Sequence, residues 1–100
     1  MISNYKSNEV KPLIIDLMKK EGHTITSDNI KIWESDAMLA KDVVGGCNWV
    51  KSNGLTPVLV YTNKVPMKDY ISKSEGVKIY DVEDLAVLAI RHNSDLIKYL

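Results

Sequence analysis

The chain is built around one short apolar run, within the sequence Asn53-Gly54-Leu55-Thr56-Pro57-Val58-Leu59-Val60-Tyr61-Thr62-Asn63. Asn53-Gly54 is a typical helix stop, and the apolar run 58–61 follows it after a short spacer. A run that is apolar at consecutive positions and rich in valine is typical of a strand covered on both faces. The flanking sequences have helical character, so we expect this run to be the central parallel strand of a small α/β domain.

Length and composition indicate a single domain over residues 1–100, with residues 1–7 as a flexible lead. Of the 100 residues, 45% are hydrophobic and 26% charged, which is ordinary for a globular chain with one core. The 13 basic residues balance the 13 acidic ones, so net charge gives no argument for nucleic acid or for an anionic membrane.

Compartment can also be inferred from the sequence. No apolar run approaches the roughly 20 residues of a transmembrane helix, and the first residues lack the apolar segment of a signal peptide. The single cysteine, Cys47, lies among apolar neighbours, where a buried and reduced thiol is expected. We therefore expect a cytoplasmic protein that does not enter a membrane.

The first half of the chain predicts two helices with strands between them. Residues 8–21 form an amphipathic helix that Gly22 ends, and residues 23–26 form a short strand. Residues 30–34 alternate as a second strand, and a helix capped by Ser35 or Asp36 continues to residue 52. The expected buried positions of the two helices are Val10, Leu13, Ile14, Leu17, Met18, Met38, Leu39, Val43, Cys47 and Val50.

Gly45-Gly46 interrupts the second predicted helix. Two glycines inside a helix indicate close approach of the helix to a sheet, or a break into two shorter helices. A phosphate-binding loop is the functional alternative, but that mechanism requires a Gly-rich turn directly after a strand. We favour the packing interpretation and leave the break open.

The second half predicts a short helix, a strand and a long apolar helix. Residues 66–73 form the short helix, with Met67, Tyr70 and Ile71 facing inward, and residues 77–80 form the strand. Asp81 caps the next helix, residues 82–91, with Asp84 in a capping-box position. We expect most of that helix to be buried and a last turn to start at Ser94 or Asp95. The resulting order predicts a right-handed parallel β-α-β-α-β unit.

This order, over residues 30–88, resembles the C-terminal half of the Mrr-type restriction-endonuclease-like, or PD-(D/E)xK, domain. The resemblance implies a small three-layer α/β sandwich of three to four mostly parallel strands flanked by helices, and an association with DNA. Gly22-His23-Thr24-Ile25 is similar to the end of the first helix and the first strand of that family. The two other segments that carry the resemblance are Pro57-Val58-Leu59-Val60-Tyr61-Thr62-Asn63 and Gly76-Val77-Lys78-Ile79-Tyr80-Asp81-Val82-Glu83-Asp84-Leu85.

The sequence departs from that family at its catalytic motif. The family holds a divalent metal with an Asp on one strand and a Glu-or-Gln-x-Lys on the next. Here the matching strand, residues 30–34, contains no such motif, and the nearby carboxylates are Asp28, Glu34 and Asp36. One interpretation makes these three the ligands of Mg²⁺, with Glu34 and Asp36 catalytic. The favoured interpretation makes them a turn residue, an edge-strand residue and a helix cap.

Other reactive residues do not form a recognisable motif. Cys47 could pair with His23 or His92 as nucleophile and base, but no motif orients them, and two histidines and one cysteine without close spacing do not predict a zinc site. Trp49, on a helix flank, is expected at the rim of the core. Trp33 is the best candidate for an exposed aromatic residue.

Two functions remain open from the sequence. The favoured one is a small non-enzymatic interaction or regulatory protein without a cofactor, on a degenerate nuclease-like scaffold, acting on a DNA-processing or defence system. Its surface is the strand face of Lys31, Trp33 and Ser35, and its partner is another protein or a second copy. The alternative is a metal-dependent nuclease, or a nuclease subunit, that acts on DNA.

Overall fold

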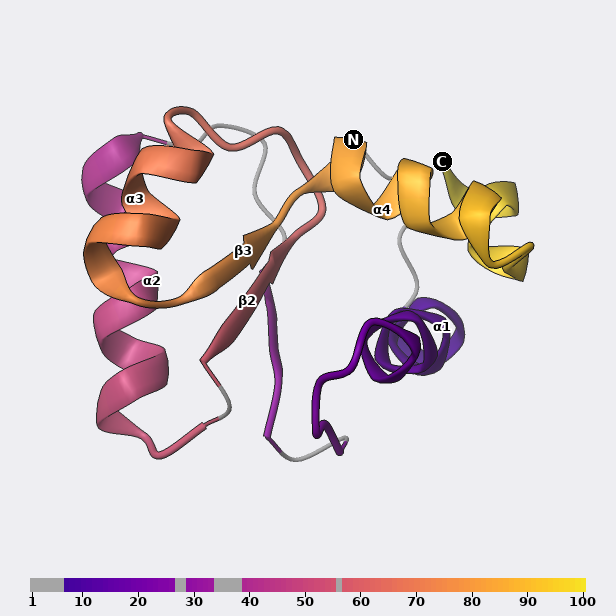
Figure 1. Ribbon diagram of the computed structural model, residues 1–100, viewed down its shortest axis with the longest axis horizontal. Coiled ribbons are helices and arrows are strands. Elements are labelled where there is room, and N and C mark those ends of the chain that lie inside the picture. Colours follow the sequence, from indigo (N-terminus) through magenta and orange to yellow (C-terminus); the bar gives the residue numbers. More distant parts are fainter. Residues whose placement is uncertain (1–6, 27–28, 34–38, 56) are drawn as a thin grey trace.

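The computed structural model describes residues 7–26, 29–33, 39–55 and 57–100. The chain alternates helices and strands, as the sequence predicts, and ends in a 3₁₀ turn (Figure 1). In order, the described elements are α1 (Ser7–Lys20), β1 (Lys31–Trp33), α2 (Ala40–Ser52), β2 (Val58–Tyr61), α3 (Lys68–Glu75), β3 (Lys78–Tyr80), α4 (Val82–Arg91) and η1 (Asp95–Tyr99).

The described strands form one parallel sheet in the order β1-β2-β3. Leu59 of the central strand is in register with Lys31 of β1 and with Ile79 of β3. All positions of β2 are buried, which confirms the prediction of a central strand covered on both faces. The fold is therefore the expected small α/β sandwich.

The helices form one layer on each face of the sheet. Figure 1 shows α2 and α3 together on one side and α1 and α4 on the other. Both crossover helices, α2 and α3, lie on the same face. The strands follow one another across the sheet in chain order, and right-handed crossovers between successive strands then place their helices on one side. The core on their face contains Val43, Cys47, Val50, Leu59, Tyr61, Val65, Ile71, Val77 and Ile79.

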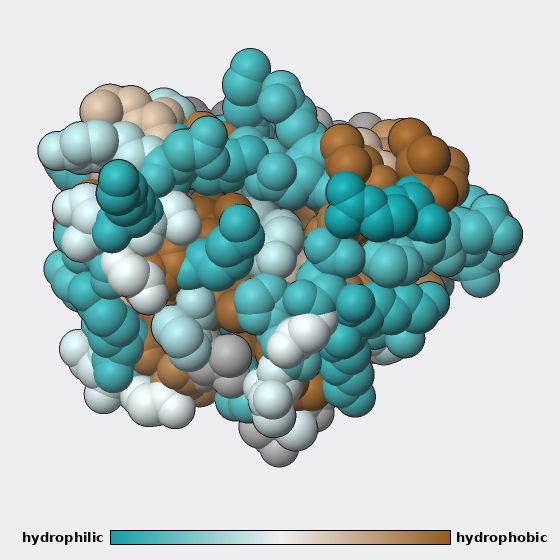
Figure 2. Space-filling model, viewed as in Figure 1, coloured by the Kyte–Doolittle hydropathy of each residue, from teal (hydrophilic) through white to brown (hydrophobic). Residues whose placement is uncertain are grey.

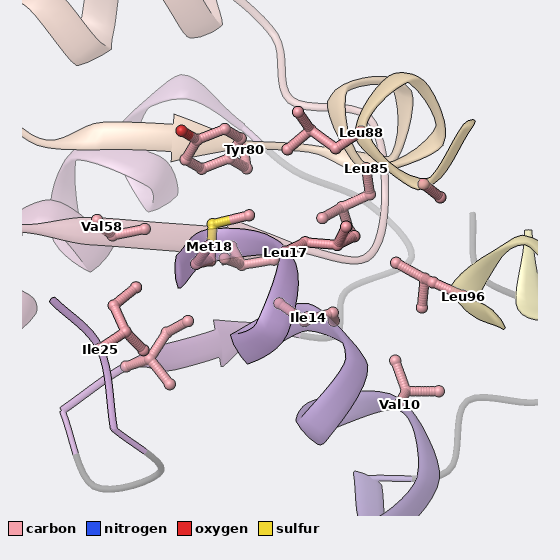
Figure 3. Close-up of a cluster of buried hydrophobic side chains, with 13 residues drawn as sticks. Val10, Ile14, Leu17, Met18, Ile25, Val58, Tyr80, Leu85, Leu88 and Leu96 are labelled. Atoms are coloured by element: carbon pink, nitrogen blue, oxygen red, sulfur yellow. The ribbon is translucent and has the colours of Figure 1, made fainter. Parts of the chain in front are cut away.

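The second core lies between the sheet and the layer of α1, α4 and η1. The stripe of α1 meets the buried face of α4, and Figure 3 shows Leu17 and Met18 between Val58 and the two leucines of α4. Leu96 of η1 is fully buried here, so the last turn belongs to the fold. The other members of this core are Val10, Ile14, Ile25, Ile30, Val60, Tyr80, Leu85, Leu88 and Ala89.

Residues 23–26, predicted as a strand, form a loop instead. The side chain of Asn29 holds this loop, because its Oδ1 accepts a hydrogen bond from the Thr26 amide at 2.7 Å and its Nδ2 donates to the Thr24 carbonyl at 3.3 Å. Asparagine side chains compete in this way with the hydrogen bonds of a sheet. Ile25 is nevertheless buried in the core that contains the apolar residues of α1.

The second helix starts later than predicted. α2 begins at Ala40, after Leu39, which has no capping side chain and is 58% exposed rather than buried. The predicted caps Ser35 and Asp36, and Met38, lie outside the described residues. The helix continues through Gly45-Gly46 without a break, with Gly46 buried and Gly45 exposed.

Two predicted apolar faces are only partly buried. Met67 precedes α3 in a left-handed conformation (φ 55°) and, like Tyr70, is more than half exposed, so Ile71 alone of the three faces inward. In α4, Val87 and Ile90 are exposed while Leu85, Leu88 and Ala89 are buried, because only one side of the helix contacts the core. The part of the chain that the structure describes contains no helix with the length and apolarity of a membrane span.

Leu59→Ala should destabilise the protein by about 2–5 kcal/mol, because Leu59 is fully buried in the central strand and its removal leaves a cavity. Leu39→Ala removes the same atoms from an exposed position and should change the free energy of unfolding by less than about 0.5 kcal/mol. Urea denaturation measures both. Equal losses in the two variants would contradict the central position of β2.

Candidate functional site

The surface at β1 and α2 contains the described part of the predicted interaction face. Ile30 and Ile32 pack toward the α1 core, which confirms the predicted alternation for the described residues. On the other face, the Lys31 ammonium lies 5.0 Å from the ring centroid of Trp49 in α2. An ammonium above an indole ring is attracted by the ring quadrupole. Lys31 and Trp49 are hereafter called the Lys31–Trp49 surface.

Trp49, which the sequence predicts at the rim of the core, is the aromatic residue of this surface. It is 42% exposed, which is compatible with a position at the rim. Its contact with Lys31 joins residues far apart in the chain, and no local pattern predicts it. Ser35 and the side chain of Trp33 lie outside the described residues, although the Trp33 backbone is in register with Tyr61.

The structure does not test the predicted metal ligands. Asp28, Glu34 and Asp36 all lie outside the described residues. Within the described ranges, no group of three or more His, Cys, Asp or Glu side chains is arranged to hold a metal ion.

Cys47 does not meet either histidine. Cys47 is buried between α2 and the sheet, where burial raises the pKa of its thiol. His23 and His92 belong to the opposite layer, where each bonds to another side chain: His23 Nε2 lies 2.8 Å from the Tyr80 hydroxyl, and His92 Nε2 lies 2.8 Å from Glu21 Oε2. The structure therefore provides no nucleophile–base pair from these residues.

A polar cluster lies where β3 ends and α4 begins. Asp81 is 2% exposed, and its Oδ1 accepts hydrogen bonds from the amides of Glu83 (3.0 Å) and Asp84 (3.2 Å). Its Oδ2 accepts from the amide of Val65, at 3.2 Å, in the connection between β2 and α3. Asp84 completes the predicted capping box by accepting from the Asp81 amide at 3.0 Å.

Lys68 of α3 supplies a positive charge to this cluster. Its Nζ lies 2.6 Å from Asp84 Oδ2 and 3.5 Å from Asp81 Oδ1. Burial is the largest single influence on the pKa of Asp84 and acts to raise it, but the hydrogen bonds from Lys68 and the Asp81 amide, together with the charge of Lys68, lower the pKa overall. Burial likewise acts to lower the pKa of Lys68, and its bond to Asp84 and the charge of Asp81 raise it. The cluster is thus a network of two carboxylates and one ammonium that ties α3 to α4, and its hydrogen bonds serve the fold.

A second polar cluster joins the ends of α1 and α4. Glu21 accepts from His92 through one oxygen and from Arg91 through the other, at 3.2 Å. The hydrogen bond from His92 is the main cause of a lowered Glu21 pKa. These residues are about 70 positions apart, so the sequence could not pair them. Like the first cluster, this one has a structural role.

Comparisons of the chain with protein-family models, with curated proteins and with solved structures give no match.

Asp84→Asn should lower stability near pH 7 by about 1 kcal/mol, because it removes the charge that pairs with Lys68 but keeps an acceptor for the Asp81 amide. The folded protein lowers the Asp84 pKa. Its contribution is therefore complete above the ordinary pKa, about 4, and is lost as the pH falls through the folded value.

Chemical denaturation from pH 7 down to about pH 3 should show the parent and Asp84→Asn converging. Asp16→Asn, which alters an exposed pair with Lys20 on α1, is the control and should differ from the parent by less than about 0.5 kcal/mol. A constant gap between parent and Asp84→Asn at every pH would show that the charge of Asp84 contributes nothing.

Proposed function

We propose that this protein is a small non-enzymatic interaction protein that binds another protein through the Lys31–Trp49 surface. The observation that carries the proposal is the half-exposed indole of Trp49 with the Lys31 ammonium 5.0 Å from its ring centroid. Tryptophan is enriched among the residues that dominate binding energy at protein interfaces, because a large rigid ring loses little entropy when it is buried. An exposed tryptophan held by a neighbouring cation is already positioned for a partner.

Strand β1 extends this surface. It is an edge strand of the described sheet, and its neighbour on one side is β2. Edge strands offer backbone groups to an incoming segment, so a partner that contacts Trp49 lies close to a sheet edge. Trp33 and Ser35, which follow Lys31 in the sequence, belong to the proposed surface as well.

We further propose that the scaffold is a degenerate restriction-endonuclease-like domain that acts in a cytoplasmic DNA-processing or defence system. The order β1-α2-β2-α3-β3-α4 supports this relationship, since it is the order that the resemblance implies. The sequence Lys31-Ile32-Trp33 in β1, where the family has Glu-or-Gln-x-Lys, supports a role without catalysis. The equal numbers of acidic and basic residues favour a protein partner over DNA, because DNA affinity rests largely on neutralising phosphates.

Trp49→Ala should reduce capture of a specific host protein by at least about tenfold, since interface tryptophans commonly contribute 2 kcal/mol or more. The measurement is a pull-down from host lysate with immobilised parent and variant, quantified for each captured protein. Lys31→Glu should also weaken capture, because it removes the cation beside the ring.

Tyr70→Ala provides the matched control, because Tyr70 is a 69% exposed aromatic residue on α3. It should capture the same protein as the parent. Thermal unfolding of each variant separates loss of binding from loss of fold. A protein captured equally by parent and Trp49→Ala, or no captured protein at all, would count against the proposed surface.

Mg²⁺ and Mn²⁺ should leave the melting temperature unchanged in a thermal-shift titration. A metal ion present at 100 times the dissociation constant of its site would stabilise the protein by about 2.7 kcal/mol, which is readily measured. Stabilisation that disappears in Glu34→Gln would favour a metal-dependent nuclease instead.

A further inference from the structure

The outward face of α4 carries an apolar stripe. Val87 is 55% exposed and Ile90 is 72% exposed, the largest value among the exposed large hydrophobic residues of the described chain. With Glu83 they occupy positions i, i+4 and i+7, which lie on one side of a helix. This side is opposite the buried face of Leu85, Leu88 and Ala89. Figure 2 shows hydrophobic surface at the upper right, where Figure 1 places α4.

The ends of this stripe carry opposite charges. Glu83 lies in the first turn of α4, with a side chain that is 62% exposed although it contacts Lys64 at 3.2 Å. Arg91 is the last residue of α4, with a side chain that is 57% exposed although it contacts Glu21 at 3.2 Å. Val87 lies midway between Glu83 and Arg91 in the sequence. Along the stripe the order is therefore a carboxylate, apolar side chains and a guanidinium, and each charged group is more than half exposed beside its partner within the chain.

Such a stripe is complementary to itself when a second copy lies antiparallel to it. A two-fold axis through Val87 brings Glu83 of each copy opposite Arg91 of the other, and it brings the two Val87 side chains together. Ile90 then lies within one helical turn of Val87 in the second copy. The two helix dipoles also oppose each other, which favours the antiparallel arrangement.

We infer that this protein forms a homodimer through α4, with the two helices packed antiparallel across a two-fold axis at Val87. The inference is independent of the Lys31–Trp49 surface, because α4 and α2 lie on opposite faces of the sheet. The stripe is short, so the dimer is a weak one that forms at high protein concentration.

Sedimentation equilibrium of the full chain from about 10 µM to about 1 mM tests the association. The parent should change from monomer toward dimer over this range. Ile90→Glu should weaken dimerisation by at least about tenfold, because it puts a charge into the apolar centre. Tyr70→Glu, on the exposed side of α3, should leave it unchanged. A parent that stays monomeric throughout, or an equal loss with Tyr70→Glu, would overturn the inference.

Charge exchange tests the antiparallel geometry itself. Glu83→Arg alone and Arg91→Glu alone should each weaken the dimer, because each places like charges opposite one another. The double variant with both changes should recover the parent's dimerisation, since every pair across the two-fold axis is then opposite again. Both changes break contacts within the chain, to Lys64 and Glu21, so damage to the fold would be greatest in the double variant. Thermal unfolding of each variant separates the two effects, and a folded double variant that dimerises no better than the single ones would exclude this arrangement.

Discussion

Every side chain of β2 is buried, with Val58 and Val60 in one core and Leu59 and Tyr61 in the other. A strand with no face toward water requires a layer of helices on each side. The two crossover helices cover one face, and α1, α4 and η1 cover the other. The rest of the architecture follows from this requirement, because a sheet this small has no other means of removing both faces of its central strand from water.

Asp81 joins the two layers at the point where the chain changes from one to the other. A carboxylate that is 2% exposed is stable only when it is paired and hydrogen-bonded. Asp81 meets both conditions, since it caps α4, accepts from Val65 and lies near Lys68. Two carboxylates and a lysine beyond the end of a parallel strand have the composition of an active site. These groups instead bond to one another, and their bonds hold the segment that leads into α3 against the start of α4.

The sequence predicts those features whose signals are local. The apolar run of β2 and the capping residues Asp81 and Asp84 lie within a few residues of the structures they form, and both are found as predicted. Exposure of Met67, Tyr70, Val87 and Ile90 was not predictable, because a pattern of apolar residues does not tell how many sides of a helix meet a core. The site is harder still to predict. Contacts such as Lys31 with Trp49, and Glu21 with His92, depend on how distant segments pack together.

The two proposed surfaces are linked by their positions. Trp49 belongs to the layer of α2 and α3, and the stripe of α4 lies on the opposite side of the sheet. Pairing of two copies through α4 therefore leaves both Lys31–Trp49 surfaces accessible. A partner with two suitable sites would bind such a dimer more tightly than a monomer, because the second contact forms at a high effective concentration. By thermodynamic linkage the same partner would strengthen the dimer. A dimer that dissociates at low protein concentration would then be stabilised by binding of the partner.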